Sequence, residues 1–156
     1  MNEMNTNKII AIDPSGTGTT GIYYAGRDTF AEFKSREWKE HFNWLVKQVE
    51  AKKPSLIVYE HANFIKLKGK DMTSLLALFG AIESLSQLSS AEVATVSVQA
   101  VKALTKQLFA GTKQIPNISY QVGRGKGWMF NGKRISLHQL EAYLVYHLWT
   151  QKNYEQ

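Results

Sequence analysis

The chain contains no cysteine, no long apolar run and no recognisable secretion signal. The absence of cysteine excludes disulfide bonds and thiolate metal sites, and it fits a reducing compartment. A membrane-spanning helix needs about 20 consecutive, mainly apolar residues, and no run approaches that length. The first residues, MNEMNTNK, lack the basic start and apolar segment of a secretory signal. We therefore expect a cytoplasmic protein without a membrane partner.

Acidic residues are also absent from a long internal stretch, Val93 to Leu140, although the whole chain has 13 of them. The cations of this stretch are Lys102, Lys106, Lys113, Arg124, Lys126, Lys133 and Arg134. Together with the net charge of +6, a long stretch of one sign favours a polyanionic partner. A solvated, lysine-rich surface is the alternative on charge alone.

The chain of 156 residues is long enough for one domain with a real hydrophobic core. No repeat, low-complexity segment or linker divides it, so we expect a single domain over residues 1–156 with its core at 8–150. The apolar pattern predicts strands at 8–13, 19–26, 28–35, 55–60 and 93–98, helices at 36–52, 71–90, 99–109 and from Ser136 onward, and a basic, Gly-rich loop at 111–134. This order indicates an α/β fold with a five-stranded mixed sheet, three antiparallel hairpin strands and then parallel strands, flanked by helices.

An acidic residue ends each of two predicted central strands. Asp13 follows the run IIAI, and Glu60 follows the run LIVY. In an open α/β sheet, ligands collect at the C-terminal ends of the strands. A buried carboxylate is costly unless its charge is compensated, and one divalent cation would compensate both acids. A turn-capping role for each acid is the alternative.

The last predicted helix supplies two further candidate ligands. Ser136 and Gln139 fit an S-x-x-Q capping box, which begins the helix at Ser136. His138 and Glu141 are then three residues apart and share a face in the first turns. The partial positive charge of the helix N-terminus favours an ionised Glu141. Taken alone, His138 fits a partly buried imidazole bonded to a carbonyl, whereas next to these acids it fits a ligand.

Four segments in this order resemble the RuvC-type Holliday-junction resolvases of the ribonuclease H-like superfamily. They are IIAIDPSGTGTTGI, LIVYEHANF with the following KDMTSLLALFGAIES, VKALTKQLFAGTK, and ISLHQLEAYLVYHLW. The resemblance runs from about residue 8 to 149 and implies a ribonuclease H-like fold. His138 stands where many members have Asp, and Glu141 stands where Asp is usual. The connection at 114–134 is also longer and more basic than in the bacterial enzyme. These departures together suggest a phage or mobile-element branch, in a bacterial or phage-infected host cell.

The resemblance implies a metal-dependent endonuclease that resolves four-way DNA junctions by hydrolysing phosphodiester bonds. Asp13, Glu60, His138 and Glu141 would bind Mg²⁺ or Mn²⁺, two ions per site, with Asp13 shared between them. Because imidazole suits Mn²⁺ better than Mg²⁺, high activity with Mn²⁺ is expected. Lys102 and Lys113, which keep the family's spacing of eleven, would stabilise charge at the scissile phosphate. Surface charge is the alternative for both lysines.

The junction is expected to contact aromatic and basic side chains around the site. Phe64, or Trp128 and Phe130 in the basic loop, would wedge or stack at an opened junction; simple flexibility is the alternative for the Gly-rich loop. The other expected DNA contacts are Lys66, Lys68, Lys70, Lys106, Arg124, Lys126, Lys133 and Arg134. Paired incision of a near two-fold junction needs two sites, so we expect a homodimer. The apolar face of helix 71–90 is the candidate interface, with monomer core as the alternative.

Three other functions remain in view. A related nuclease could act on RNA, or on flaps and branched DNA, with the same fold. A non-catalytic junction-binding protein is possible, although binding alone needs no buried acids. The opening motif also resembles the phosphate-binding hairpin of actin-like ATPases and sugar kinases, but 156 residues leave no room for their second nucleotide-binding lobe.

Overall fold

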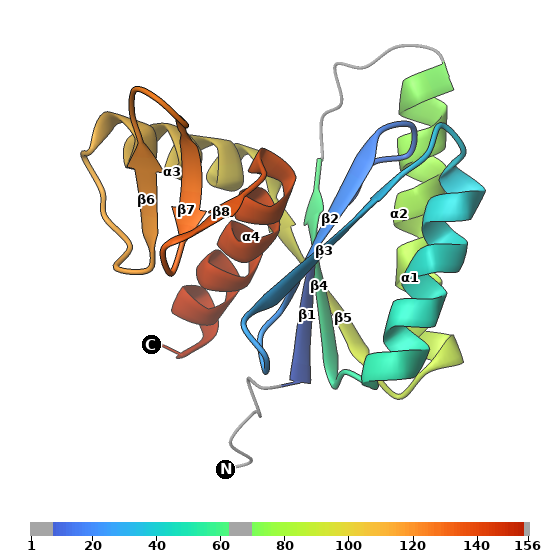
Figure 1. Ribbon diagram of the computed structural model, residues 1–156. Coiled ribbons are helices and arrows are strands. Elements are labelled where there is room, and N and C mark those ends of the chain that lie inside the picture. Colours follow the sequence, from blue (N-terminus) through green and yellow to red (C-terminus); the bar gives the residue numbers. More distant parts are fainter. Residues whose placement is uncertain (1–7, 63–69, 155–156) are drawn as a thin grey trace.

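The structure, a computed structural model, describes residues 8–62 and 70–154. A five-stranded sheet with the strand order β3-β2-β1-β4-β5 forms its centre (Figure 1). The first three strands, which pair antiparallel, are β1 (Ile9–Asp13), β2 (Thr19–Tyr24) and β3 (Thr29–Lys34). β4 (Leu56–His61) pairs parallel with β1, and β5 (Glu92–Ser97) pairs parallel with β4. The five-stranded mixed sheet predicted from the sequence is therefore confirmed.

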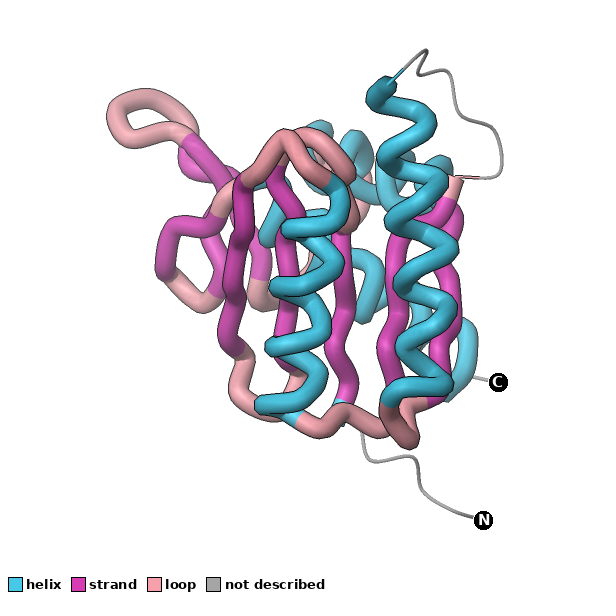
Figure 2. Tube along the Cα trace, turned by 90° about the vertical axis from the view of Figure 1, so that its right-hand side faces the viewer, coloured by secondary structure: helices cyan, strands magenta, loops and turns pink. Residues whose placement is uncertain are grey.

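Helices cover both faces of this sheet (Figures 1 and 2). One face packs against α1 (Trp38–Lys52) and α2 (Lys70–Leu88), and the other against α3 (Val98–Ala110) and α4 (Leu137–Tyr154). In β1, Ile10 and Ile12 face the first layer, whereas Ile9 and Ala11 face the second. Because both faces of β1 are buried, its sequence is a continuous apolar run and not an alternating one.

The connection at 111–134 differs from the expected loop, because it contains a second sheet. This sheet has the order β6-β7-β8 and consists of β6 (Ile118–Gln121), β7 (Gly127–Phe130) and β8 (Lys133–Ile135). Trp128 and Phe130 are buried in the core beside α3 and α4, at 9% and 3% exposure. The expectation that these two rings stack at an opened junction is therefore wrong, since packing the small sheet onto the helices occupies both.

The apolar face of α2 is largely monomer core. Phe79, Ile82 and Leu85 are at most 5% exposed and pack against the sheet. Leu76, at 50% exposure, remains accessible on the outer side of the helix. α2 also begins at Lys70, one residue before the expected start at 71, so Asp71 lies in its first turn. Among the residues that the structure describes, no helix is long and apolar enough to cross a bilayer.

Candidate metal centre

The two strand-end acids lie side by side because β1 and β4 are parallel and in register. Ile12 is opposite Tyr59 in this pairing, so the next residues, Asp13 and Glu60, are neighbours at the same sheet edge. Both side chains are nearly buried, at 7% and 8% exposure. The sequence-based expectation that two remote strands bring their acids together agrees with this geometry.

The third acid comes from the first turn and a half of α4. Gln139 Oε1 accepts a hydrogen bond from the Ser136 backbone N–H at 3.0 Å, and Ser136 Oγ accepts one from the Gln139 N–H at 3.1 Å. These reciprocal bonds form the predicted capping box. The helix start packs tightly on β2, since a Cβ at Gly21 would lie 2.4 Å from the carbonyl oxygen of His138. Only glycine at this position lets α4 approach closely enough to bring Glu141 to the sheet edge.

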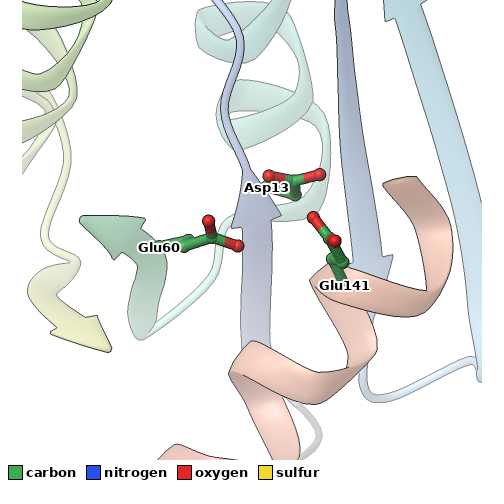
Figure 3. Close-up of side chains that lie close together, drawn as sticks. All are labelled: Asp13, Glu60 and Glu141. Carbon is green, nitrogen blue, oxygen red and sulfur yellow. The ribbon is translucent and has the colours of Figure 1, made fainter. Parts of the chain in front are cut away.

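Asp13, Glu60 and Glu141 form one cluster in which each residue offers a carboxylate oxygen, and these oxygens lie within 4.8 Å of one another. Figure 3 shows the three side chains pointing toward a common point from β1, β4 and α4. Such a set of oxygen donors is what Mg²⁺ or Mn²⁺ binds. Asp13, Glu60 and Glu141 are thus brought together as the sequence suggested.

The protein environment alone does not compensate these charges. Burial, and then the negative charges of Asp13 and Glu141, raise the pKa of Glu60 to about 9. Burial likewise raises the pKa of Glu141 to about 7 and raises the pKa of Asp13 above its ordinary value. Lys102 acts in the opposite direction on all three groups. Without a cation, the cluster therefore holds protons that ordinary carboxyl groups would have lost.

One oxygen supports the fit of a cation in particular. Oε2 of Glu60 is buried and has no hydrogen-bond partner among the described residues. A buried, unpartnered acceptor costs free energy, and a hard cation would satisfy it. The carboxylates present therefore fit a divalent ion in donor type, in number and in their unmet bonding capacity.

His138 lies beside this cluster and contacts it through one acid. Its Nδ1 is 3.3 Å from Oδ2 of Asp13, and its side chain is 44% exposed. This hydrogen bond, and then the nearby negative charges, raise the pKa of the imidazole. Because Nδ1 is engaged with Asp13, Nε2 is the ring nitrogen left to bind an ion or a water molecule. The expected role of His138 as a direct ligand stays a prediction.

A cavity of about 720 Å³ contains the cluster and shows which other residues border it. Lys102 lines the cavity, as expected, and so does His138. The sequence analysis did not anticipate the remaining polar lining, which includes Ser15, Thr17, Thr19, Asp71 and Gln99. Asp71 gave no signal beyond its place at the expected start of the helix at 71–90, whereas the hydroxyl residues follow Asp13 closely in the chain.

The loop after Asp13 is fixed by a buried histidine that the sequence analysis did not single out. Oγ1 of Thr20 accepts a hydrogen bond from the Ser15 N–H at 3.0 Å and lies 2.9 Å from Nδ1 of His41. Nε2 of His41 is 2.8 Å from the carbonyl oxygen of Ser35, so this nitrogen carries the proton. His41 is 0% exposed. Its bond to Thr20, whose hydroxyl group holds Ser15, connects α1 to the loop that borders the cavity.

The other predicted site residues lie elsewhere. Lys113 follows the C-terminal end of α3 and lines a separate cavity with Gln107 and His147. Lys102 borders the cavity of the three acids, whereas Lys113 does not. Lys106 is exposed one turn of α3 beyond Lys102, and the small sheet exposes Arg124, Lys126, Lys133 and Arg134. Phe64, Lys66 and Lys68 lie outside the described residues, and only the backbone of Lys70 is described.

Comparisons with known proteins identify the fold. No protein-family model matches the sequence, and no curated protein matches it. The chain is similar to Thermus thermophilus RuvC in complex with Holliday junction substrate, with a TM-score of 0.61 and 12% identity over 93% of this chain and 94% of that one. It is also similar to the yeast mitochondrial Holliday junction resolvase Ydc2, with a TM-score of 0.55 and 11% identity over 96% and 82% of the two chains. A further T. thermophilus RuvC structure gives a TM-score of 0.56 with 14% identity. The chain therefore has the ribonuclease H-like fold of these resolvases.

Proposed function

We propose that this chain, with its RuvC-type ribonuclease H-like fold, is a metal-dependent endonuclease that resolves four-way DNA junctions by paired incisions. The observation that carries the proposal is the convergence of the buried Asp13 and Glu60 with the half-buried Glu141, within 4.8 Å, from two strands and a helix. A junction-binding protein without catalytic activity has no need of such a cluster, because withdrawing clustered carboxyl groups from water is costly. The resolvase fold favours branched DNA over other nucleic acids as the substrate.

The residues of the cavity divide the chemistry among them. Asp13, Glu60 and Glu141 would hold one or two Mg²⁺ or Mn²⁺ ions through carboxylate oxygens. When bound, such an ion supplies an activated water and neutralises charge on the phosphate. His138 orients the carboxylate of Asp13 through the Nδ1 hydrogen bond and keeps Nε2 for an ion or a water molecule. Lys102, whose charge acts on all three acids, would stabilise the phosphate as charge develops.

Paired cutting requires two such sites, and we propose that a homodimer supplies them. The part of α2 that stays outside the core is the candidate interface. Leu76 and Gly80 border an open groove there with His61 and Phe79. A Leu76→Glu variant should sediment as a monomer if this groove is the contact. An obligate monomer in the wild type, even with junction bound, would contradict paired incision.

The test of the nuclease uses labelled four-way junction, flap, linear duplex and RNA–DNA hybrid with Mg²⁺ or Mn²⁺. Wild-type protein should cut two strands of the junction at symmetric positions and leave the linear duplex intact. Asp13→Asn, Glu60→Gln and Glu141→Gln should each abolish cleavage while junction binding persists. A matched control is Glu50→Gln, because Glu50 is an exposed acid on α1, and this variant should cut normally.

Each other outcome identifies a different function. Preferential cutting of flaps or of the hybrid would replace the junction as substrate while keeping the metal centre. Cleavage that survives in all three acid variants would refute the site. Binding without any cleavage by the wild type, under either metal, would leave the non-catalytic junction-binding protein as the function.

A further inference from the structure

The turn between β6 and β7, residues 122–126, projects from the small sheet. Figures 1 and 2 show this turn at the same end of the molecule as the C-terminal ends of β1 and β4. It therefore lies on the side from which a substrate would reach the metal cavity. Gly123 and Gly125 both have left-handed backbone conformations, with φ of +80° and +75°, which glycine adopts without strain.

The turn is held rigidly despite its glycines. Nη1 of Arg134 donates a hydrogen bond to the Lys126 carbonyl oxygen at 3.0 Å, and Nη2 donates one to the Gly125 carbonyl oxygen. The guanidinium lies across the base of the turn, since a Cβ at Gly127 would be 3.2 Å from Nη1. Gln121 also donates a side-chain hydrogen bond to the carbonyl oxygen of Arg124 at 3.2 Å. Arg134 thus acts as an internal brace.

The charges at the turn are uncompensated. Arg124 and Lys126 are exposed, and the stretch from Val93 to Leu140 contains no acidic residue. Within the described part of the chain, the only ion pair joins His138 to Asp13, so no described carboxylate neutralises either cation. Uncompensated cations on a rigid projection attract a polyanion and lose little entropy when they bind it.

The side chains at the turn favour duplex DNA over unpaired strands. Proteins bind single strands through aromatic side chains on which bases stack, and residues 122–126 include no aromatic side chain. Trp128 and Phe130 are buried. An exposed ring on α3, that of Phe109, packs edge-on against Tyr120 of the small sheet with the ring centroids 5.0 Å apart.

We infer that the β6–β7 turn binds the sugar-phosphate backbone of a duplex arm, with Arg124 and Lys126 as the phosphate contacts and Arg134 as the brace that holds them. This inference rests on the proposed function for its partner, DNA. It adds a binding surface remote from the acids and independent of metal.

The experiment measures binding of the full chain to a labelled linear duplex, and to a four-way junction, at several KCl concentrations in EDTA. Each phosphate contact contributes about 0.9 to the slope of log K against log salt. Arg124→Gln and Lys126→Gln should each lower the slope by about 0.9, which corresponds to about an eightfold loss of affinity at 0.1 M salt. Lys47→Gln is the matched control, because Lys47 is an exposed cation on α1, and its slope should not change.

Arg134 is tested by two substitutions. If Arg134 is a brace, Arg134→Lys and Arg134→Gln should behave alike. Both variants should keep the wild-type slope of log K against log salt, and both should show faster amide exchange at residues 122–126. If Arg134 contacts phosphate instead, only Arg134→Gln should lose about 0.9 of slope, and the assignment of the brace is overturned.

Two further results would overturn the inference as a whole. One is an unchanged slope in both Arg124→Gln and Lys126→Gln. The other is a loss of junction binding in Phe109→Ala without any effect of the two cation variants, which would indicate base stacking. Because EDTA prevents metal-dependent cleavage, a failed nuclease assay leaves this measurement readable, and a failed slope test leaves the nuclease proposal standing.

Discussion

Metal-free protein should lose stability as the pH rises from 5 to 8, because its clustered carboxyl groups must then ionise while buried. A glutamate in the unfolded chain has a pKa of about 4.5, whereas burial and the neighbouring acids raise that of Glu60 to about 9. A carboxyl group whose pKa is higher in the folded than in the unfolded state does not lower the free energy of unfolding at a pH below its unfolded pKa. Above that pKa it lowers the free energy of unfolding more with each pH unit, until the pH reaches the folded pKa. For Glu60 at pH 8 the cost is about 5 kcal/mol, from about 3.5 pH units at about 1.4 kcal/mol each.

This cost is large beside the total stability of about 5–15 kcal/mol that is common for single domains. Urea unfolding, followed by tryptophan fluorescence in EDTA, should therefore give a free energy of unfolding that falls by several kcal/mol between pH 5 and pH 8. Glu60→Gln should remove the share of this fall that comes from Glu60, so that the variant is more stable than the wild type at pH 8 and similar to it at pH 5. Part of the fall should remain in the variant, because burial also raises the pKa of Glu141 to about 7. Glu50→Gln, which changes an exposed acid, should follow the wild-type curve.

Added metal should restore the stability lost at high pH only in a protein that keeps all three acids. Mn²⁺ at 100 times its dissociation constant should stabilise the wild type by about 2.7 kcal/mol, whereas Glu60→Gln should gain much less. A wild-type free energy of unfolding that is flat or rises over this pH range in EDTA would refute the reasoning, since the buried acids would then have no electrostatic cost.

Three further predictions concern the surroundings of the cluster. Gly21→Ala should lower the free energy of unfolding by at least 2–3 kcal/mol and reduce cleavage, because the added methyl group meets the backbone of His138; an unchanged free energy of unfolding in a urea titration would contradict this close contact. His138→Ala should change the ratio of Mg²⁺-supported to Mn²⁺-supported cleavage rates, and an unchanged ratio would argue against coordination. His41→Phe should cost about 2 kcal/mol in urea unfolding, because it removes the hydrogen bonds of the ring to Thr20 Oγ1 and to the Ser35 carbonyl oxygen; full stability in this variant would contradict that role.

The strands and the acids were predictable because local sequence determines them. The runs before Asp13 and Glu60 are continuously apolar, which indicates strands buried on both faces, and the parallel pairing of such strands aligns their ends. The capping box at Ser136 and Gln139 fixed the start of α4 and therefore the face that carries Glu141.

The small sheet was not predictable in the same way. Its strands have at most four residues, and glycines and exposed polar residues interrupt their apolar pattern. Trp128 and Phe130 are buried only because α3 and α4 provide a surface for them, which is a tertiary effect. The two lysines spaced by eleven illustrate the same limit. A helix advances about 1.5 Å per residue, so α3 separates Lys102 and Lys113 although their spacing matches the family.

The cluster of three acids takes its members from the first strand, the fourth strand and the last helix. A nascent chain that has emerged only as far as residue 136 contains every described strand but lacks the third acid. Under the proposed function, a chain that ends before Glu141 lacks one metal ligand, so translation that stops before this residue should yield a product that does not cut DNA.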